Sequence, residues 1–358
     1  VTSPRVEVSI DQDVYLPGST VTGTIRIHSS SSIRGDRIHA RFIGKSQAEF
    51  QSDCKRTYSN LRTIVDDSKE LWKYHSLAQM LGLGEEIEPD EPSSFSPQAQ
   101  FPFHFHIPDH APTSLTVPGV PVNIRYAIEF RVFDSSTVSI FHEYPIIVVR
   151  PLCVTRPISN GRMNHSKKIS LPGDRSILLE CSLGKSVFTS ADEIDARITV
   201  VNRWKESLKY IRFFLITKVE ATARSLDANG DLTTKTFLLE HNGVGMPSDK
   251  VKIPCGEAFT FSPHYNVPGL NPDATIPDFL RLSHSLAIDV GRSKQLVLAR
   301  LQIPVSIVTA FVEVAPTKSV STPKEEVLID LSSSSPSNHF LALSPTNPFR
   351  NAQFDLLA

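Results

Sequence analysis

Short runs in which apolar and polar residues alternate recur along the chain and predict strands. Residues 125–132 place an apolar side chain at every second position, with three charged residues and an alanine between them. Successive side chains of a strand point to opposite faces, so one face of this run suits a core and the other suits water. Residues 101–105, 286–290 and 297–303 repeat the alternation. Because Pro-Gly turns separate the runs, the pattern predicts antiparallel β-sandwiches.

The same pattern occurs twice. Residues 6–45 match residues 179–218 without a gap, at an offset of 173 positions (14 to 187). Nine apolar residues meet apolar residues at this offset: Val6, Val8, Ile10, Val14, Val21, Ile25, Ile27, Ile38 and Phe42 with Leu179, Cys181, Leu183, Val187, Ile194, Ile198, Val200, Ile211 and Leu215. Gly18 and Gly23 correspond to Ala191 and Ala196. A duplicated all-β unit is therefore predicted, and this disfavours an enzyme.

The chain is long enough for two domains and a tail. The parts that we predict are a first sandwich over 1–150, a linker over 151–174, a second sandwich over 175–313 and a disordered tail over 314–358. The tail is rich in Ser, Pro, Thr and Asn and poor in aliphatic residues, a composition that cannot bury enough surface to fold.

The later halves of the two units match at a smaller offset, since Phe103 corresponds to Phe261. The first unit therefore carries about fifteen extra residues, which we place in a long loop over 46–100. This loop includes one possible short helix, Leu71 to Leu83, and an acidic stretch, Glu85 to Pro97. It is either disordered, which we favour, or functional.

Composition excludes several classes of function. The net charge is −1, from 37 basic and 38 acidic residues, so no overall field favours nucleic acid or an anionic membrane. The four cysteines are far apart and lack zinc-ligand spacing, which fits a reducing compartment. No signal-like or membrane-spanning apolar segment is visible. We therefore expect a cytoplasmic protein without a cofactor.

Catalytic motifs are also missing. There is no nucleophile elbow, zinc-protease helix, phosphate-binding loop or dinucleotide fingerprint. His104 and His106 alternate with phenylalanines, so they share one face of a strand. Such a pair suits either a metal or a solvent-exposed face, and we favour the exposed face because the phenylalanines need the core. We predict neither catalytic residues nor a metal site.

Five segments of the first unit, taken in order, resemble a known family. They are V-Y-L-P-G-S-T-V-T-G-T-I-R-I (14–27), R-I-H-A-R-F-I-G-K (37–45), F-P-F-H-F-H-I-P (101–108), P-T-S-L (112–115) and I-R-Y-A-I-E-F (124–130). Their order is similar to that of the arrestin family, closest to its arrestin-domain-containing (α-arrestin) branch, and the resemblance covers residues 5 to about 310. It implies two tandem antiparallel β-sandwiches. It also implies a non-enzymatic adaptor that binds cytoplasmic regions of membrane proteins and links them to sorting machinery.

The sequence departs from this family in two places. Many α-arrestins carry P-P-x-Y motifs for ubiquitin ligases, and the nearest match here is Ser262-Pro263-His264-Tyr265, at an expected strand end. Any ubiquitin ligase is therefore expected to act indirectly. Arg5 and Glu7 occupy the stretch where some arrestins carry the paired lysines that sense phosphate, so that mechanism is not implied.

The tail contains a segment that resembles a clathrin box, formed by Leu328, Ile329, Asp330 and Leu331. Alternating aliphatic residues in an extended peptide can occupy grooves of a β surface. The alternative is a chance cluster in a polar tail. We favour clathrin binding because large aliphatic residues in a disordered segment bury nothing locally.

A second tail segment, Asn347-Pro348-Phe349, matches the N-P-F motif that EH domains bind. Asn and Pro form a tight turn that presents the Phe ring to a pocket. The terminal residues Phe354, Asp355, Leu356 and Leu357 resemble short coat- or adaptor-binding peptides, or form an ordinary apolar end. Several weak peptides on one flexible tail would bind jointly through their high effective concentration.

The predicted linker region is basic, with Arg150, Arg156, Arg162, Lys167 and Lys168. These residues suit either an anionic ligand, such as a phosphoinositide or a phosphorylated peptide, or simply a solvated linker, which we favour.

These features lead us to expect an adaptor in endocytic and endosomal trafficking that is recruited to the plasma membrane or to endosomes through its partners. Its sandwiches would bind cargo, and its tail would bind clathrin and EH-domain proteins. The alternatives are an arrestin-like signalling scaffold and a structural coat subunit of the retromer type.

Overall fold

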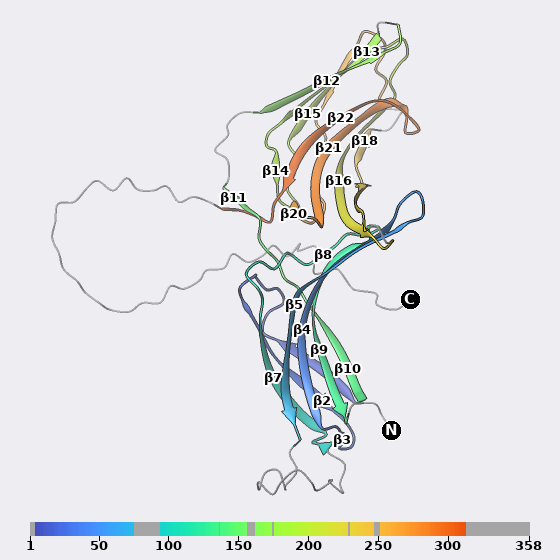
Figure 1. Cartoon of the computed structure of the whole chain (residues 1–358). Helices are drawn as coiled ribbons and strands as arrows, with labels where there is room; N and C mark the ends of the chain where they lie inside the picture. The colour runs from blue at the N-terminus through green and yellow to red at the C-terminus, as the bar shows by residue number, and fades with distance from the viewer. Residues whose placement is uncertain are drawn as a thin grey trace, which may run out of the picture. The chain divides into compact units, whose positions relative to one another are not determined.

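The computed structural model describes residues 4–74, 94–135, 137–155, 162–173, 175–227, 230–246 and 251–312 (Figure 1). Within these ranges the chain forms strands joined by turns and loops, so the all-β prediction is confirmed. The described ranges contain no helix that could cross a bilayer. The chain forms two compact units: unit 1 comprises Val1–Arg150, Val219–Phe237 and Ile276–Arg281, and unit 2 comprises Pro151–Lys218, Leu238–Thr275 and Leu282–Ala358.

The strands of the first 150 residues are β1 (Arg5–Ile10), β2 (Thr20–His28), β3 (Ile33–Arg34), β4 (Arg37–Gln51), β5 (Thr57–Lys73), β6 (Ser94–Phe95), β7 (Gln98–His106), β8 (Leu115–Thr116), β9 (Val122–Asp134) and β10 (Thr137–Ile146). The remaining strands are β11 (Cys153–Thr155), β12 (Met163–Leu171), β13 (Arg175–Leu183), β14 (Val187–Phe188), β15 (Ala196–Arg203), β16 (Tyr210–Ser225), β17 (Leu232–Glu240), β18 (Val244–Met246), β19 (Ala258–Phe261), β20 (Ala274–Ile276), β21 (Leu280–Ser293), β22 (Leu296–Ile307) and β23 (Ala310–Val312).

Unit 1 contains a β-sandwich. One sheet has the order β1-β2-β7, and the other contains β10-β9-β4-β5 with β8 paired to β9. Phe42 of β4 packs against Phe105 of β7, with ring centroids 6.0 Å apart, and against Tyr126 of β9 at 6.2 Å. All three side chains are almost completely buried. The alternating aromatic residues seen in the sequence therefore fill the core between the two sheets.

Unit 2 repeats this construction. One sheet has the order β12-β13-β15-β19, and strands β16, β21, β22 and β14 follow one another in the second sheet, where β18 also pairs with β16. Its core contains residues from both sheets, including Ile198 of β15, Leu215 of β16 and Ile288 of β21.

The structure bears out the repeat read from the sequence, down to the strand register. The six pairs of the β1–β2 ladder run from Arg5↔His28 to Ile10↔Gly23. Pairs exactly 173 positions later, from Leu178↔Val201 to Leu183↔Ala196, form the β13–β15 ladder. The turn before the second strand of each ladder is repeated as well, because Gly18 (φ 81°) and Ala191 (φ 71°) both have left-handed backbone conformations.

The predicted long loop over 46–100 is wrong for its described residues. Strand β4 continues to Gln51 and pairs with β5 along its whole length, so residues 52–56 form a short connection. Most side chains of β5 are exposed or only half-buried. The strand therefore has no buried apolar face that the sequence pattern could show. Residues 71–73 of the proposed short helix belong to this strand, and residues 75–83 lie outside the described ranges.

The predicted linker over 151–174 also contains strands. β11 pairs in parallel with β23, and β12 pairs with β13 over nine residues. Most residues of β12 are polar, so the pattern of apolar and polar positions did not predict this strand. Backbone pairing with β13 holds the strand in place. The boundaries of unit 2 also differ from those expected for the second sandwich, since residues 219–237 and 276–281 group with unit 1.

Candidate binding face

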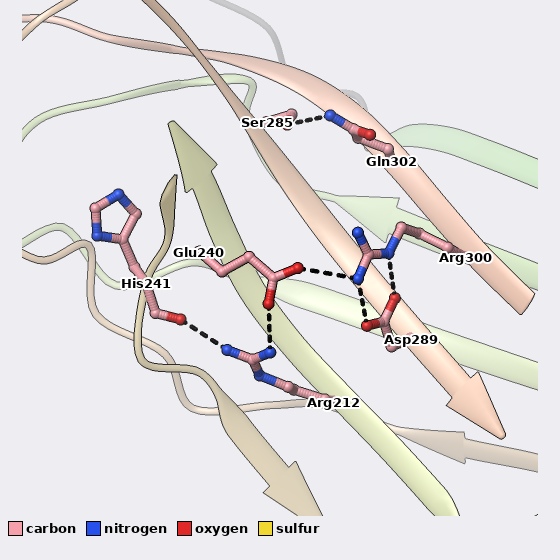
Figure 2. Close-up of polar contacts among 7 residues, drawn as sticks. All are labelled: Arg212, Glu240, His241, Ser285, Asp289, Arg300 and Gln302. Carbon is pink, nitrogen blue, oxygen red and sulfur yellow. Dashed lines mark hydrogen bonds and ion pairs between the residues drawn. The ribbon is translucent and has the colours of Figure 1, made fainter. Parts of the chain in front are cut away.

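Four charged side chains gather on one face of the β16-β21-β22 sheet in unit 2 (Figure 2). Arg212 comes from β16, Glu240 from the last position of β17, Asp289 from β21 and Arg300 from β22. The residues before and after each β16, β21 and β22 member are core residues. Strand alternation therefore puts the charged residues on the face away from the core.

Hydrogen bonds join these side chains in one chain. The guanidinium of Arg300 donates through Nε and Nη2 to the two carboxylate oxygens of Asp289, at 2.6 and 2.7 Å, and through Nη2 to Glu240 Oε1 at 3.1 Å. Arg212 donates through Nη1 to Glu240 Oε2 at 2.9 Å and through Nη2 to the backbone oxygen of His241 at 3.0 Å. Figure 2 shows the order Asp289–Arg300–Glu240–Arg212, which we call the charge network.

An aromatic ring lies beneath both arginines. The Arg212 guanidinium carbon is 3.9 Å from the centroid of the Phe214 ring, and that of Arg300 is 5.4 Å away. Phe214 is completely buried although it does not face the main core. The planar guanidinium groups of both arginines cover the Phe214 ring and interact with its π face. The network therefore shields this ring, as a packed layer of apolar side chains would otherwise do.

The charges of the network cancel. Asp289 is only 2% exposed, and its ion pair with Arg300 offsets the cost of burying the charge. Burial alone would raise the pKa of Glu240, but hydrogen bonds from Arg212 and Arg300 bring that pKa below its usual value. The hydrogen bond to Asp289 raises the pKa of Arg300. The network is therefore neutral overall, and both arginines already have carboxylate partners.

Unit 1 carries a related network on the sheet β5-β4-β9-β10. Arg41 donates to Asp66 at 2.6 Å and lies 3.6 Å from Glu129, which also accepts from Arg131 at 2.7 Å. The Arg131 guanidinium in turn lies 5.5 Å from the centroid of Phe141, a ring that is 53% exposed. Alternating charges thus cross the strands of this sheet and end at an exposed aromatic ring.

The repeat places the two networks at equivalent positions. Arg131 lies opposite Phe141 in the β9–β10 ladder. The corresponding pair in the β21–β22 ladder, at offsets of 158 (131 to 289) and 159 (141 to 300), is Asp289 opposite Arg300. One backbone position therefore supports a cation–π pair in unit 1 and an ion pair in unit 2. This difference gives the two faces different chemistry on the same framework.

The described residues of the basic region make separate contacts. Arg150 belongs to unit 1 and donates to the backbone oxygen of Asp109. In unit 2, Arg162 forms two hydrogen bonds of 2.9 Å with Asp195, which offsets its charge. Lys167 and Lys168 are consecutive residues of β12 and so point to opposite faces. Anion binding by the basic region stays a prediction, and Arg156 lies outside the described ranges.

The three tail motifs, 328–331, 347–349 and 354–357, also lie outside the described ranges. The structure therefore places none of the predicted clathrin-, EH- or coat-binding residues. Their assignment remains a prediction that depends on the sequence pattern alone.

The predicted exposed face of the histidine pair is confirmed. His104 and His106 are exposed on β7, whereas the phenylalanines that alternate with them are buried. Tyr265, from the segment nearest to a P-P-x-Y motif, is buried in the core and packs edge-on against Phe213. A WW domain could not reach this tyrosine in the folded unit. Among the described residues, no group of three or more His, Cys, Asp or Glu side chains could hold a metal ion.

Sequence reasoning missed the charge network. Asp289 occupies the apparent water-facing side of an alternating strand, between buried Ile288 and Val290. Glu240 lies at the end of another strand, and Arg300 lies within a third. These residues are far apart in the sequence, so no local sequence pattern links them. The duplication was the one usable signal, because it aligns Asp289 with Arg131 and Arg300 with Phe141.

Comparison with known proteins agrees with the fold. Residues 5–155 match the family model described as "Arrestin (or S-antigen), N-terminal domain". The chain is 30% identical over 374 aligned positions to Protein ttm-2 of Caenorhabditis elegans, an alignment that covers 99% of both chains. It is 26% identical over 131 positions to Phosrestin-1 of Drosophila melanogaster, covering 34% of this chain and 33% of that protein.

Proposed function

Because this chain belongs to the arrestin family, whose members act as adaptors or scaffolds, we propose that it is a trafficking adaptor in endocytic and endosomal sorting. In this role it works in the cytoplasm and reaches the plasma membrane or endosomes through its partners. It binds cytoplasmic regions of membrane proteins through its two sandwiches and coat components through its tail. The observation that carries the proposal is the similarity over 99% of the chain together with short segments, outside the described ranges, that resemble coat-binding motifs.

The two sheet faces are the cargo-binding surfaces in this proposal. Each presents side chains held by hydrogen bonds before a partner arrives, so little side-chain entropy is lost on binding. The face of unit 1 offers the exposed ring of Phe141 beside Arg131. Aromatic residues and arginines often dominate binding energy at protein interfaces. The face of unit 2 offers charged groups that already have partners, and it suits a polar peptide.

The clathrin assignment is tested by replacing Leu328 and Leu331 with Ala. We expect the full-length double variant to capture less clathrin than the wild type, because alternating aliphatic residues supply the apolar contacts. A matched control replaces Leu341 and Leu343, which have the same residue types and lie in the same tail. Equal clathrin capture by the test variant and the wild type would reject residues 328–331 as a clathrin site.

The EH-domain assignment is tested by Phe349→Ala, with Phe340→Ala as the control in the same tail. We expect Phe349→Ala to abolish EH-domain pulldown, since the ring of an N-P-F motif fills the domain's pocket. Unchanged pulldown would reject the assignment. The terminal peptide 354–357 is a further coat-binding candidate, whose loss should weaken capture by reducing multivalency.

The alternatives predict different partners. A signalling scaffold would recruit kinases or receptors without entering coated structures, and a structural coat subunit would co-purify stably with a helical-solenoid partner. Proximity labelling in cells with wild-type protein and the two tail variants distinguishes these outcomes. A set of labelled coat proteins that depends on residues 328–331 and 347–349 supports the trafficking adaptor.

A further inference from the structure

Three exposed side chains of β10 lie on the outer face of the sheet in unit 1. Phe141 and Glu143 are two positions apart on this strand, so they point to the same face. Phe141 lies opposite Arg131, and Val138 lies opposite Phe133, two residues of β9 that also share this face. Val138 is 41% exposed and Phe141 is 53% exposed. We call Val138, Phe141 and Glu143 the β10 patch.

The carboxylate of Glu143 has no cationic partner among the described residues. Glu143 lies directly opposite Glu129 in the β9–β10 ladder. Glu129 accepts a hydrogen bond from Arg131 at 2.7 Å and lies 3.6 Å from Arg41. Like charges that lie directly opposite each other on adjacent strands are destabilising. A positively charged group from a binding partner would relieve this repulsion at Glu143.

The second copy of the repeat carries no such pair. At the equivalent positions of unit 2, at offsets of 158 (129 to 287) and 159 (143 to 302), Ala287 lies opposite Gln302. Gln302 donates through Nε2 to the hydroxyl of Ser285 at 2.7 Å (Figure 2). A neutral pair therefore occupies this ladder position in unit 2. The sandwich can be built without two carboxylates here, so Glu143 is available for a role in binding.

Strand β10 is unsuited to pairing with a further strand. It contains Pro145, which has no N–H group, and its pairing with β9 shifts register between Val138 and Ile140. Both features disfavour the addition of a strand at a sheet edge. A partner would therefore contact the β10 patch through side chains.

We propose that the β10 patch binds a basic segment in which an aliphatic residue lies two positions from an arginine or lysine. Phe141 and Glu143 are about 7 Å apart along their strand, and an extended segment has the same spacing. The aliphatic side chain packs on Phe141 and Val138, and the cation reaches Glu143. Cytoplasmic segments next to membrane-spanning helices carry an excess of Lys and Arg. The inference rests on the proposed function and deepens it, because it names the kind of cargo segment that the face of unit 1 takes.

Fluorescence anisotropy with the full-length chain and labelled synthetic peptides tests the chemistry of the ligand. The probe peptide has leucine and arginine in turn at every second position, with serines between them. We expect it to bind at least about tenfold more tightly than a version with glutamate in place of arginine, or with serine in place of leucine. Added salt should weaken its binding, because the ion pair with Glu143 is exposed. Equal binding of the three peptides, or binding that salt does not weaken, would overturn the proposal.

Two variants locate the site. Phe141→Ala should weaken binding of the probe peptide about tenfold, because the ring supplies the apolar contact. Glu143→Gln should weaken it by up to about fivefold, the effect of one exposed ion pair. The matched controls are Leu61→Ala and Glu49→Gln, which change an exposed leucine of β5 and an exposed glutamate of β4 in the same sheet. If the controls weaken binding as much as the test variants do, the site is not on β10.

Urea unfolding separates loss of the site from loss of the fold. Glu143→Gln removes the repulsion with Glu129, so the midpoint of unfolding should stay unchanged or rise while binding weakens. A midpoint that falls together with the binding would count against the proposal. Self-association of the wild-type chain that Phe141→Ala abolishes would identify a second copy as the occupant and reject a cargo segment.

The peptide test and the tests of the proposed function can fail separately. No coat protein takes part in the anisotropy measurement, and the capture of clathrin and EH domains depends on the tail variants alone. Peptides that do not bind would therefore reject the β10 patch as a cargo site without rejecting the tail motifs. Tail variants that capture coat proteins normally would reject those motifs without rejecting the β10 patch.

Discussion

Replacing Arg300 by methionine should destabilise unit 2 more than neutralising its partner Asp289 does. The Asp289 side chain is 3% exposed and the Arg300 side chain is 41% exposed. Arg300→Met leaves a buried carboxylate without its guanidinium, whereas Asp289→Asn leaves Arg300 with Glu240 and with access to water. The loss of stability therefore depends on which partner remains without its counter-ion. It is larger when the buried Asp289 carboxylate remains.

The magnitude follows from this burial. Breaking a fully buried ion pair from one side costs about 3–5 kcal/mol. Because Arg300 is partly exposed, we expect a smaller cost than for a fully buried pair, about 2–3 kcal/mol, for Arg300→Met. We expect about 1 kcal/mol for Asp289→Asn, which keeps the volume and one hydrogen-bond acceptor. The double variant should cost less than the sum of the single variants by at least about 1 kcal/mol, since each single change removes the same contact.

Urea unfolding monitored by tryptophan fluorescence measures these energies. Trp204 packs against the core of unit 2, and the chain has two tryptophans. A Trp72→Phe background therefore makes the signal specific to unit 2. If Asp289→Asn costs as much as Arg300→Met, or if the two costs add in the double variant, the argument that burial of Asp289 makes this pair important is wrong.

Two further predictions concern the backbone and pH. Ala191 has a left-handed conformation that disfavours side chains, so Ala191→Gly should raise stability by about 0.5 kcal/mol, whereas Gly18→Ala should lower it by about 1–2 kcal/mol in thermal unfolding. Burial, and to a smaller extent His284, lowers the pKa of His241 in the folded chain. Below about pH 6.5, His241 therefore binds a proton more readily in the unfolded chain than in the folded one. Stability should therefore fall from about pH 7 to about pH 5.5, and His241→Gln, unlike the exposed control His264→Gln, should reduce this slope in urea unfolding.

The two sheet faces show how duplication produces different surfaces. Arg131 with Phe141 and Asp289 with Arg300 occupy equivalent ladder positions. In unit 1 the ring remains exposed, and in unit 2 both partners are charged and one is buried. Because a cation–π pair and an ion pair both hold adjacent strands together, either can occupy the position. The framework is thus retained while the chemistry offered to a partner changes.

Strands with one apolar face were predictable from the sequence. Phe101, Phe103 and Phe105 alternate with exposed residues, and the structure buries all three. Strand β5 was not predictable in this way. Its exposed and half-buried positions are held by pairing with β4 rather than by a buried face. Backbone pairing leaves little trace in side-chain periodicity, so a strand of this kind resembles a loop in sequence.

By itself, the sequence determined the duplicated all-β architecture, the position-by-position match of residues 6–45 with 179–218 and the family, because strand periodicity and turn residues are local properties. Only the tertiary structure decided that Asp289 is buried and bonded to Arg300, and that Glu240 joins both to Arg212. These contacts join residues up to 60 positions apart (240 to 300), and the network spans 88 positions (212 to 300). Their energies depend on desolvation, which arises only when the sheet has assembled around them.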